Sequence, residues 1–470
     1  ASAHDRSVAR RSSVATAVEP SAMTAPRTPA KRTTAMARVG SMLGRRSILS
    51  MGALMALGAC APRGLSGPSV PRFDWTLRSP AEAGMSDAGI AAVRAAVQQQ
   101  IDAGVINGAV SAIARHGKLV HYEAQGFADP VAKTPMRKDA IFRVMSSSKP
   151  VTALAVLTLV DEGKLSLDDK VSKYMPSFAS PRVAGAPPGN PDPAKVRIVP
   201  ADRELVIRDL LTHTSGITVV GHEPSAGPAG LVNKLERRPD ETLESFAPRA
   251  GTEVLQFQPG TKFSYSPTDA HDIALYIVQL VSGRRADVYM RERIFAPLEM
   301  VDSYYRVPAE KKGRLVDIFS VKDGTWSKAP DIFEKIPPGY FSGGGGICST
   351  VHDFMNFEQM LLGRGSFNGR RIIRPETLAL MNQNVVGRLF ADWFPALTKN
   401  NGFGLSVRIA EEGNVNGRSV GAYGWGGAYG TESWVEPSLD LAGVFFIQMN
   451  PPPFSASGNF ETAARAAIVA

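Results

Sequence analysis

Apolar residues fill almost every position from 151 to 160, and this run predicts a helix that is buried on all sides. Only two threonines interrupt the run, and Gly163 follows it as a helix-ending residue. Ser146 and Lys149 come just before the run, so we expect both on the first turn of the helix. Residues three apart on a helix share one face with Cβ atoms about 5–6 Å apart, so the Lys149 amine can reach the Ser146 hydroxyl.

Apolar residues recur at helical spacing in several other segments. One predicted helix begins near Ser86 and ends at Gly104, with Ile90, Val93 and Val97 on a single stripe. Further helices are predicted over 206–212, 269–281, 461–469 and a segment that runs to Met300.

Strand-like patterns lie near both ends of the folded part of the chain. Residues 109–115 and 118–126 form a predicted hairpin, with His116 and Gly117 at its turn. Near the C-terminus, short aromatic or β-branched runs are separated by Gly, Asn and Pro, which is typical of an antiparallel meander. These runs cover 403–409, 419–423, 431–436 and 442–449.

Strands at both ends with helices between them predict an α+β fold, in which one antiparallel sheet flanked by helices is assembled from both parts. The sheet part comprises about 81–140 and 340–470, and a mostly helical part, about 141–339, is inserted. Within the helical part, we expect 179–202 to be a surface loop and 218–250 to be a mobile lid or rim.

Residues 1–60 combine a stretch of disorder-promoting composition with a predicted export signal. Arg45 and Arg46 precede a short apolar run and the small residues before Cys60, which resembles a twin-arginine signal with a lipobox-like cleavage point. We therefore expect an exported protein, periplasmic or attached to the envelope, with Cys60 as a candidate lipid anchor. A Pro/Gly-rich linker is expected over 61–80.

The net charge of +9 belongs to the N-terminal segment. Residues 1–80 hold twelve Lys and Arg and three Asp and Glu, whereas residues 81–470 hold forty-one of each kind. A neutral folded part offers no general basic surface, so nucleic acid is not an expected partner. The two cysteines, Cys60 and Cys348, leave no disulfide if Cys60 is lipidated or removed. No metal-binding motif is present, and we expect neither a metal nor another cofactor.

Three separated segments carry candidate chemistry. Ser146 and Lys149 form the only Ser-x-x-Lys pair in the chain. The alternative for the same sequence is a helix-capping serine beside a solvated lysine. Tyr265 lies in the segment 260–267, and the glycine-rich segment 424–431 contains Trp425. A serine hydroxyl is a poor nucleophile unless a neighbour takes its proton, and an amine or a phenol can do so.

The order and spacing of these segments resemble the serine β-lactamase and penicillin-binding-protein superfamily, and within it the class C-like carboxylesterases often called family VIII. The segments 210–216, 297–300 and 342–350 share this resemblance, which covers roughly residues 80–450. It implies a β-lactamase/transpeptidase-like fold.

The resemblance implies that Ser146 is the nucleophile and that Lys149 and Tyr265 share its proton. It also implies that the backbone N–H groups of Ser146 and Ala428 form the oxyanion hole. Which of Lys149 and Tyr265 is the base in acylation stays open, and a packed aromatic at a turn is the alternative role for Tyr265.

The triplet Trp425, Gly426 and Gly427 stands where β-lactamases of this type carry Lys-Thr-Gly, and it is the expected substrate-binding strand edge. Trp425 removes the cation that would meet a β-lactam carboxylate. Pro267 stands where these enzymes usually carry an asparagine. Both departures favour neutral esters over anionic lactams.

Three other features invite different interpretations. Residues 417–421 fit the Gly-x-Ser-x-Gly elbow of α/β-hydrolases, but that fold needs a histidine downstream of the serine, and the last histidine is His352. His213 is expected to satisfy a backbone carbonyl rather than to catalyse. Aromatic residues at 390–394 fit either an apolar acyl pocket or core packing.

The sequence therefore predicts a serine hydrolase that cleaves small-molecule carboxylic esters with short to medium acyl chains through an acyl-enzyme. A β-lactamase or D,D-peptidase, and an acyltransferase that uses the same acyl-enzyme, are alternatives within the same fold. A non-catalytic envelope protein that retains the scaffold is the alternative from another class.

Overall fold

The computed structural model describes residues 72–185, 192–218, 227–332, 334, 336–414, 417–453 and 455–469. The predicted export signal, Cys60 and most of the predicted linker lie outside these residues, so the expectations about them stay predictions. All described residues belong to one unit, which begins at Ser66.

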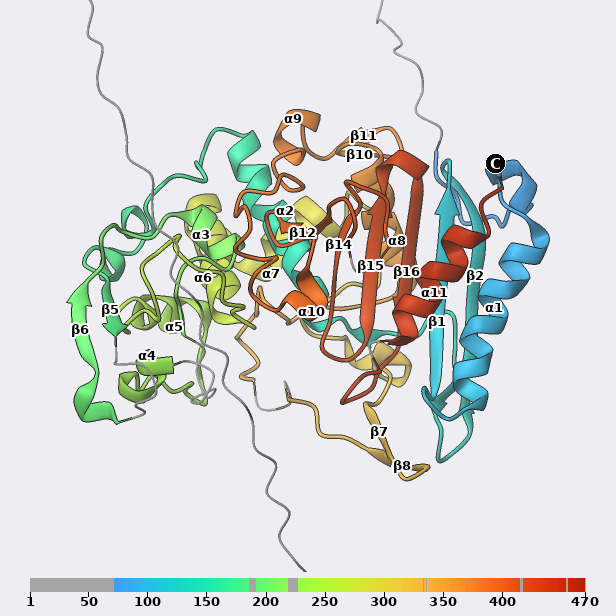
Figure 1. Ribbon diagram of the computed structural model, residues 1–470, viewed down its shortest axis with the longest axis horizontal. Coiled ribbons are helices and arrows are strands. Elements are labelled where there is room, and N and C mark those ends of the chain that lie inside the picture. The colour runs from blue at the N-terminus through green and yellow to red at the C-terminus, as the bar shows by residue number, and fades with distance from the viewer. Residues whose placement is uncertain are drawn as a thin grey trace, which may run out of the picture. The chain divides into compact units, whose positions relative to one another are not determined.

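One antiparallel sheet joins strands from the two ends of this unit (Figure 1). The two parts are joined by the pair β1 with β16, in which Val110 lies opposite Phe446. This pairing confirms the prediction of a single sheet built from N- and C-terminal parts. The order of the strands is β12 (Asn401–Phe403), β13 (Arg408–Ala410), β14 (Tyr423–Gly426), β15 (Thr431–Glu436), β16 (Leu441–Phe446), β1 (Gly108–Arg115), β2 (Lys118–Asp129) and β3 (Thr134–Pro135).

The predicted hairpin between β1 and β2 is confirmed. Its two turn residues, His116 and Gly117, both have positive φ, at 52° and 65°. Two consecutive left-handed residues form the tight turn whose twist matches that of paired strands.

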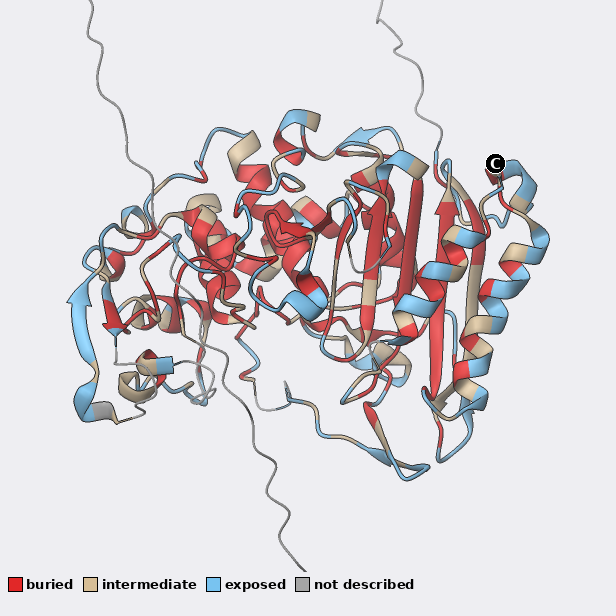
Figure 2. Ribbon diagram, in the orientation of Figure 1, coloured by how far each residue is buried: buried red, intermediate tan, exposed pale blue. Residues whose placement is uncertain are grey.

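Helices cover both faces of the sheet, so β1 and β16 in its middle are buried on both sides (Figure 2). Leu441 and Phe445 of β16 pack with α1 (Asp87–Asp102) and α11 (Ser455–Ala466) on one face. Val444 and Phe446 of the same strand pack with α8 (Val351–Leu362) on the other face. Alternate residues of a strand point to opposite faces, so one strand contributes to two cores.

The helical part is built around α2 (Ser148–Asp161), which is buried along almost its whole length, as predicted. α6 (Asp269–Ser282) packs against α2. Gly163 has a φ of 68° just beyond the end of α2, so the expected glycine stop is present. The other helices are α3 (Ile207–Leu211), α4 (Gly227–Val232), α5 (Leu243–Ala250), α7 (Ala286–Met290), α9 (Pro375–Leu378) and α10 (Pro395–Thr398).

Four short two-stranded pairs lie outside the main sheet. They are β4 (Phe142–Arg143) with β9 (Cys348–Ser349), β5 (Arg182–Gly185) with β6 (Arg197–Pro200), β7 (Phe319–Lys322) with β8 (Thr325–Lys328), and β10 (Ser366–Phe367) with β11 (Arg370–Arg371).

Four predicted segments differ from the structure. The segment 419–423 reaches a strand, β14, only at its last residue, Tyr423. The segment 179–202 contains the paired strands β5 and β6, and 218–250 contains α4 and α5; both segments are too polar and too rich in Gly and Pro for their periodicity to show. The segment 403–409 is the end of β12, a turn and the start of β13. Ser406 in that turn has a φ of 68°, and its N–H donates to the Leu211 carbonyl. The chain therefore turns at Ser406, and the buried apolar residues beside it lie on a turn and not on a strand.

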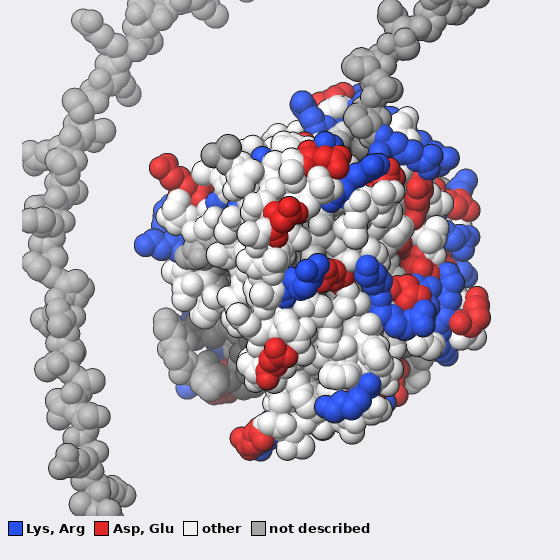
Figure 3. Space-filling model, turned by 90° about the vertical axis from the view of Figure 1, so that its right-hand side faces the viewer, with Lys and Arg blue, Asp and Glu red and all other residues white. Residues whose placement is uncertain are grey.

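The surface carries both signs of charge. Figure 3 shows Lys and Arg side chains lying among Asp and Glu side chains on one face of the molecule. Arg94 of α1, for example, pairs with Glu123 of β2. Among the described residues, no helix is both long and apolar enough to cross a bilayer.

Candidate active site

Ser146 lies on a 3-10 turn, Met145–Ser147, immediately before α2. The prediction placed it on the first turn of the helix itself, whereas the chain makes this tighter turn first, with Met145 in the left-handed region at a φ of 51°. Thr431 of β15 holds the turn to the sheet, since its hydroxyl donates to the Val144 carbonyl at 2.9 Å and lies 3.1 Å from the Ser147 hydroxyl. Ser146 itself is partly exposed, so a substrate can reach it.

Lys149 is fully buried directly behind Ser146. Its Nζ donates to Ser146 Oγ at 3.0 Å, to the Pro267 carbonyl at 2.6 Å and to the Gly344 carbonyl at 2.7 Å. A lysine ammonium has three N–H donors, so all three are satisfied here. The solvated-lysine alternative is therefore wrong.

The loop that supplies the Gly344 carbonyl is organised by Asp272, a fully buried residue of α6. Its carboxylate accepts hydrogen bonds from the Gly344 N–H at 3.1 Å, the Ser342 hydroxyl at 2.7 Å and the Tyr340 hydroxyl at 2.6 Å. A Cβ on Gly344 would lie 2.5 Å from the Thr268 Cα, so this glycine is required by close backbone packing. Sequence reasoning missed Asp272, because no motif sets it apart from the other acidic residues.

Tyr265 lies against the same ammonium. Its ring centroid is 4.9 Å from Lys149 Nζ, which is a cation–π distance. The phenol oxygen accepts a hydrogen bond from Trp425 Nε1 at 3.3 Å, and the two rings are 5.6 Å apart. The Ser146 hydroxyl and the Tyr265 ring therefore both lie against the Lys149 amine, and Trp425 adds a donor to the phenol that the sequence did not indicate.

His213 supports Tyr265 from behind, with ring centroids 4.5 Å apart. Its Nδ1 accepts the Ser266 N–H at 3.1 Å, so the expected bond to a carbonyl is wrong and the partner is an amide. Burial, with the nearby charge of Lys149 as a second cause, holds the pKa of His213 well below its usual value. The ring is therefore neutral at physiological pH, and its contact with the Ser266 amide fixes the chain next to the phenol.

The glycines after Trp425 bring a sheet edge against the Ser146 turn. A Cβ on Gly427 would lie 2.2 Å from the Val144 carbonyl and 3.2 Å from the Met145 Cβ, so only glycine allows this approach. Trp425 and Gly426 are the last residues of β14, as expected for residues on a strand. Ala428 follows as an exposed residue beside the turn that carries Ser146.

The Gly-x-Ser-x-Gly pattern at 417–421 has a structural role. Arg418 is 4% exposed and makes two hydrogen bonds to Glu461, at 2.6 and 2.9 Å. The Ser419 hydroxyl donates to Glu436 at 2.7 Å. The pattern therefore anchors a turn to α11 and β15 and supplies no nucleophile.

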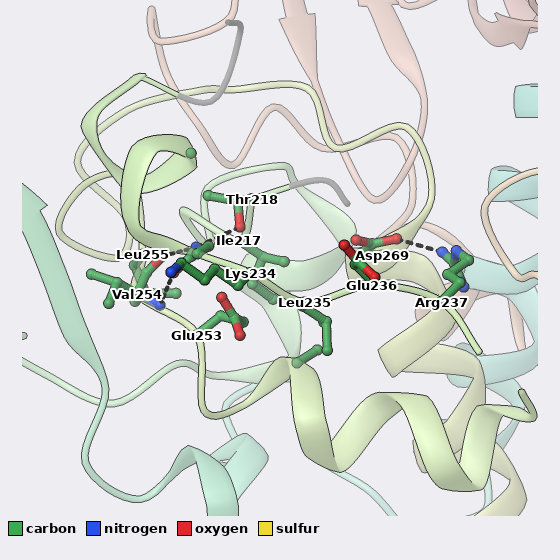
Figure 4. A pocket seen from close by; sticks show the side chains of 13 residues that line it. Ile217, Thr218, Lys234, Leu235, Glu236, Arg237, Glu253, Val254, Leu255 and Asp269 are labelled. Atoms are coloured by element: carbon green, nitrogen blue, oxygen red, sulfur yellow. Dashed lines mark hydrogen bonds and ion pairs between the residues drawn. The ribbon is translucent and has the colours of Figure 1, made fainter. Parts of the chain in front are cut away.

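A pocket of about 520 Å³ lies in the helical part, and Figure 4 shows its lining. Lys234 and Glu253 line one part of it, and Asp269 pairs with Arg237 at 2.7 Å on another side. None of the predicted site residues lines this pocket.

Among the described residues, no group of three or more His, Cys, Asp or Glu side chains is arranged to hold a metal ion. Cys348 in β9 is a free thiol, and burial raises its pKa to about 11. It therefore stays protonated at neutral pH and is a poor nucleophile.

Comparison with known proteins gives three consistent findings. The model of the Beta-lactamase family matches residues 93–468. Protein Rv1367c of Mycobacterium tuberculosis is 32% identical over 76% of this chain and 90% of its own length, and Esterase EstB of Burkholderia gladioli is 29% identical over 77% and 91%. Among solved structures, EstCE1, a hydrolase with promiscuous acyltransferase activity, is 25% identical with a TM-score of 0.67 over 80% of this chain and 99% of that one.

Proposed function

Because this chain belongs to the Beta-lactamase family, we propose that it is a serine hydrolase that cleaves carboxylic esters of short to medium acyl chains through an acyl-enzyme. One observation carries the proposal: a fully buried ammonium, Lys149, donates to a partly exposed serine hydroxyl while the Tyr265 ring lies 4.9 Å from the same nitrogen. A capping serine needs no such buried cation.

In the proposed acylation step Tyr265 acts as a phenolate: Ser146 Oγ attacks the ester carbonyl carbon as its proton passes to the phenolate oxygen of Tyr265, which becomes a neutral phenol. Lys149 has its three N–H donors directed at oxygen atoms and stabilises the negative charge that moves between serine and phenol. The hydrogen bond from Trp425 Nε1 supports this role for Tyr265, because the Tyr265 oxygen is the acceptor in that bond and a base must likewise accept a proton.

The tetrahedral intermediate places its negative oxygen against the N–H groups of Ser146 and Ala428. When it collapses, the bond from carbon to the alcohol oxygen breaks, and Tyr265 returns its proton to the leaving alkoxide. Water then repeats the sequence on the acyl-enzyme, with Tyr265 as base, and releases the acid. The close approach of Gly427 to the Ser146 turn supports this pairing of amides.

Two features favour neutral esters over β-lactams. Trp425 offers a neutral indole where related β-lactamases carry a lysine, and Pro267 offers no side-chain amide. The name of Esterase EstB supports the same choice. Acyl transfer to an alcohol is the second candidate, because EstCE1 is described as having promiscuous acyltransferase activity.

The direct test is Ser146→Ala, measured with p-nitrophenyl butyrate and with a fluorophosphonate label mapped by mass spectrometry. The variant should lose ester hydrolysis by several orders of magnitude and lose the label. Ser180→Ala, which changes an exposed serine, is the matched control and should keep both. Full activity in Ser146→Ala would eliminate the proposal and leave the non-catalytic scaffold as the better interpretation.

Two comparisons separate the alternatives within the fold. Hydrolysis of nitrocefin at a rate matching that of p-nitrophenyl butyrate would favour the β-lactamase or D,D-peptidase assignment. Formation of a new ester when a candidate alcohol is added would favour the acyltransferase.

We also propose export with lipid attachment at Cys60. The twin-arginine pair and the short apolar run before Cys60 support this. Cys60→Ser should release the protein from the membrane fraction of the expressing cell, and an unchanged distribution would contradict the anchor.

A further inference from the structure

Large apolar side chains are exposed in the segment 385–397, whose Trp393 ring lies 6.3 Å from the Tyr265 ring. The exposed fractions are 36% for Val385, 45% for Trp393, 53% for Phe394 and 60% for Leu397. We call these four residues the apolar rim. Exposed apolar side chains that gather in one place mark ligand-binding or interaction surfaces more often than scattered ones do.

The apolar rim is held by a buried aromatic cluster. Phe263, Phe390 and Phe403 pack with one another at centroid distances of 4.9 to 5.1 Å. Trp393 contacts two members of this cluster, with its ring 5.1 Å from Phe263 and 6.4 Å from Phe390. Phe390 is therefore a core residue, whereas Trp393 packs against the outside of that core and leaves nearly half of its surface exposed.

The same cluster extends to the proposed catalytic phenol. Tyr265 and Trp425 both pack against it. The Tyr265 ring is 5.6 Å from Trp425 and 6.3 Å from Trp393, so one indole from β14 and one from the apolar rim both contact the phenol.

The proposed reaction places one half of the substrate next to these indoles. Tyr265 must come within about 2.6–3.2 Å of the alcohol oxygen in order to protonate it as it leaves. The carbon skeleton of the alcohol begins at that oxygen, so it extends among the rings that surround the phenol. The acyl group is attached to the carbonyl carbon, on the other side of the scissile bond.

We propose that the site selects esters whose alcohol moiety is a flat apolar or aromatic group, which lies against the indoles of Trp425 and Trp393. This inference rests on the proposed function and names its substrate class. Ring faces carry partial negative charge, so an anionic alcohol moiety is disfavoured at the same place. Contact with one aromatic ring contributes about a two- to tenfold change in rate.

The experiment compares butyrate esters of ethanol, 2-naphthylmethanol and 4-carboxybenzyl alcohol. These alkyl-type alcohols have similar leaving-group acidity, so differences report binding to the protein and not intrinsic reactivity. Release of butyric acid, followed in a pH-stat, gives kcat/KM for each ester. We expect the naphthylmethyl ester to exceed the ethyl ester at least tenfold and the carboxybenzyl ester to gain nothing over ethyl.

Trp393→Ala should lower the naphthylmethyl-to-ethyl ratio about fivefold. Leu77→Ala removes an apolar side chain of similar exposure, 52%, from the N-terminal segment and should leave the ratio unchanged. Leu397→Ser is the second rim variant and should lower the ratio by a smaller factor. Because the ratio is measured within each variant, loss of folded protein does not alter it.

The outcomes separate the two levels of the proposal. If the wild-type ratio is near one, or if Trp393→Ala leaves it unchanged, the assignment of the alcohol side is wrong while ester hydrolysis stands. If none of the three esters is cleaved and Ser146 takes no fluorophosphonate label, the proposed function itself fails.

Discussion

Glu358 gives a prediction whose sign and size follow from burial. This residue of α8 is 1% exposed and faces the sheet, and burial raises its pKa from 4.5 to about 8. A hydrogen bond from Ser433 and the charge of Arg418 act in the opposite direction, and the charge of Glu432 adds to the rise. The carboxyl group is therefore mostly protonated in the folded protein at neutral pH.

The unfolded chain exposes the same carboxyl group, which then ionises near its ordinary pKa of 4.5. Folding thus takes up a proton between about pH 4.5 and pH 8, and the stability contributed by this group falls as the pH rises through that window. At about 1.4 kcal/mol for each pH unit, the loss is about 3 kcal/mol at pH 7 and approaches 5 kcal/mol above pH 8. Below pH 4.5 the contribution is fully present.

Glu358→Gln removes this titration and keeps the shape of the side chain. We expect the variant to match the wild type near pH 4.5 and to be more stable by about 3 kcal/mol at pH 7 and by more at pH 8. Urea unfolding at pH 4.5, 7 and 8, followed by tryptophan fluorescence, measures the difference directly.

Glu123→Gln is the control, and its effect on stability at pH 7 should have the opposite sign. The hydrogen bond from Arg94 lowers the pKa of Glu123, so this group contributes stability above its unfolded pKa and loses it in acid. The control should therefore be slightly less stable than the wild type at pH 7 and equal to it in strong acid. A Glu358→Gln difference that is the same at pH 4.5 and pH 8 would refute the reasoning.

Three further predictions concern the site. Gly427→Ala should reduce kcat about 10²- to 10³-fold in steady-state kinetics, which is the effect of losing one oxyanion donor. Gly458→Ala is the control and should leave kcat unchanged, because a Cβ at Gly458 meets nothing within 4 Å. Asp272→Ala should lower kcat at least tenfold with little change in KM, because the Gly344 N–H and the Ser342 hydroxyl lose their common acceptor; an unchanged kcat would count against this role. Trp425→Phe keeps the ring but deletes the donor to the phenol and should cost about tenfold in kcat/KM; equal values would show that the bond is unimportant.

Local patterns allowed much of the fold to be predicted. The run at 151–160 is apolar all round, which only a fully buried helix explains, and α2 is that helix. The β1–β2 hairpin follows from two β-patterned runs separated by two residues. The family resemblance rested on the order of three segments and is confirmed by the match over 93–468.

The prediction failed where long-range contacts decide the backbone. Ser406 turns the chain between β12 and β13 because its N–H reaches Leu211, a contact about two hundred residues away in sequence. In the sequence, Asp272 looks like any acidic residue of a helix, and its role depends on hydrogen bonds from the distant loop at 342–346. Neither role leaves a periodic pattern, so no reading of a short window could find it.

The two serine-containing motifs show what separates a chemical site from a structural one. Ser419 has a carboxylate neighbour, Glu436, that accepts its proton in a hydrogen bond, but that carboxylate is also paired with Arg465 and serves to hold a turn. Ser146 instead receives a hydrogen bond from a buried ammonium and shares that cation with the Tyr265 phenol. A cation that donates to the serine oxygen favours the alkoxide, whereas a carboxylate that accepts from it favours the neutral hydroxyl. Charge around the oxygen, and not the spacing of letters in the motif, is therefore what supports the proposal that Ser146 is the attacking residue.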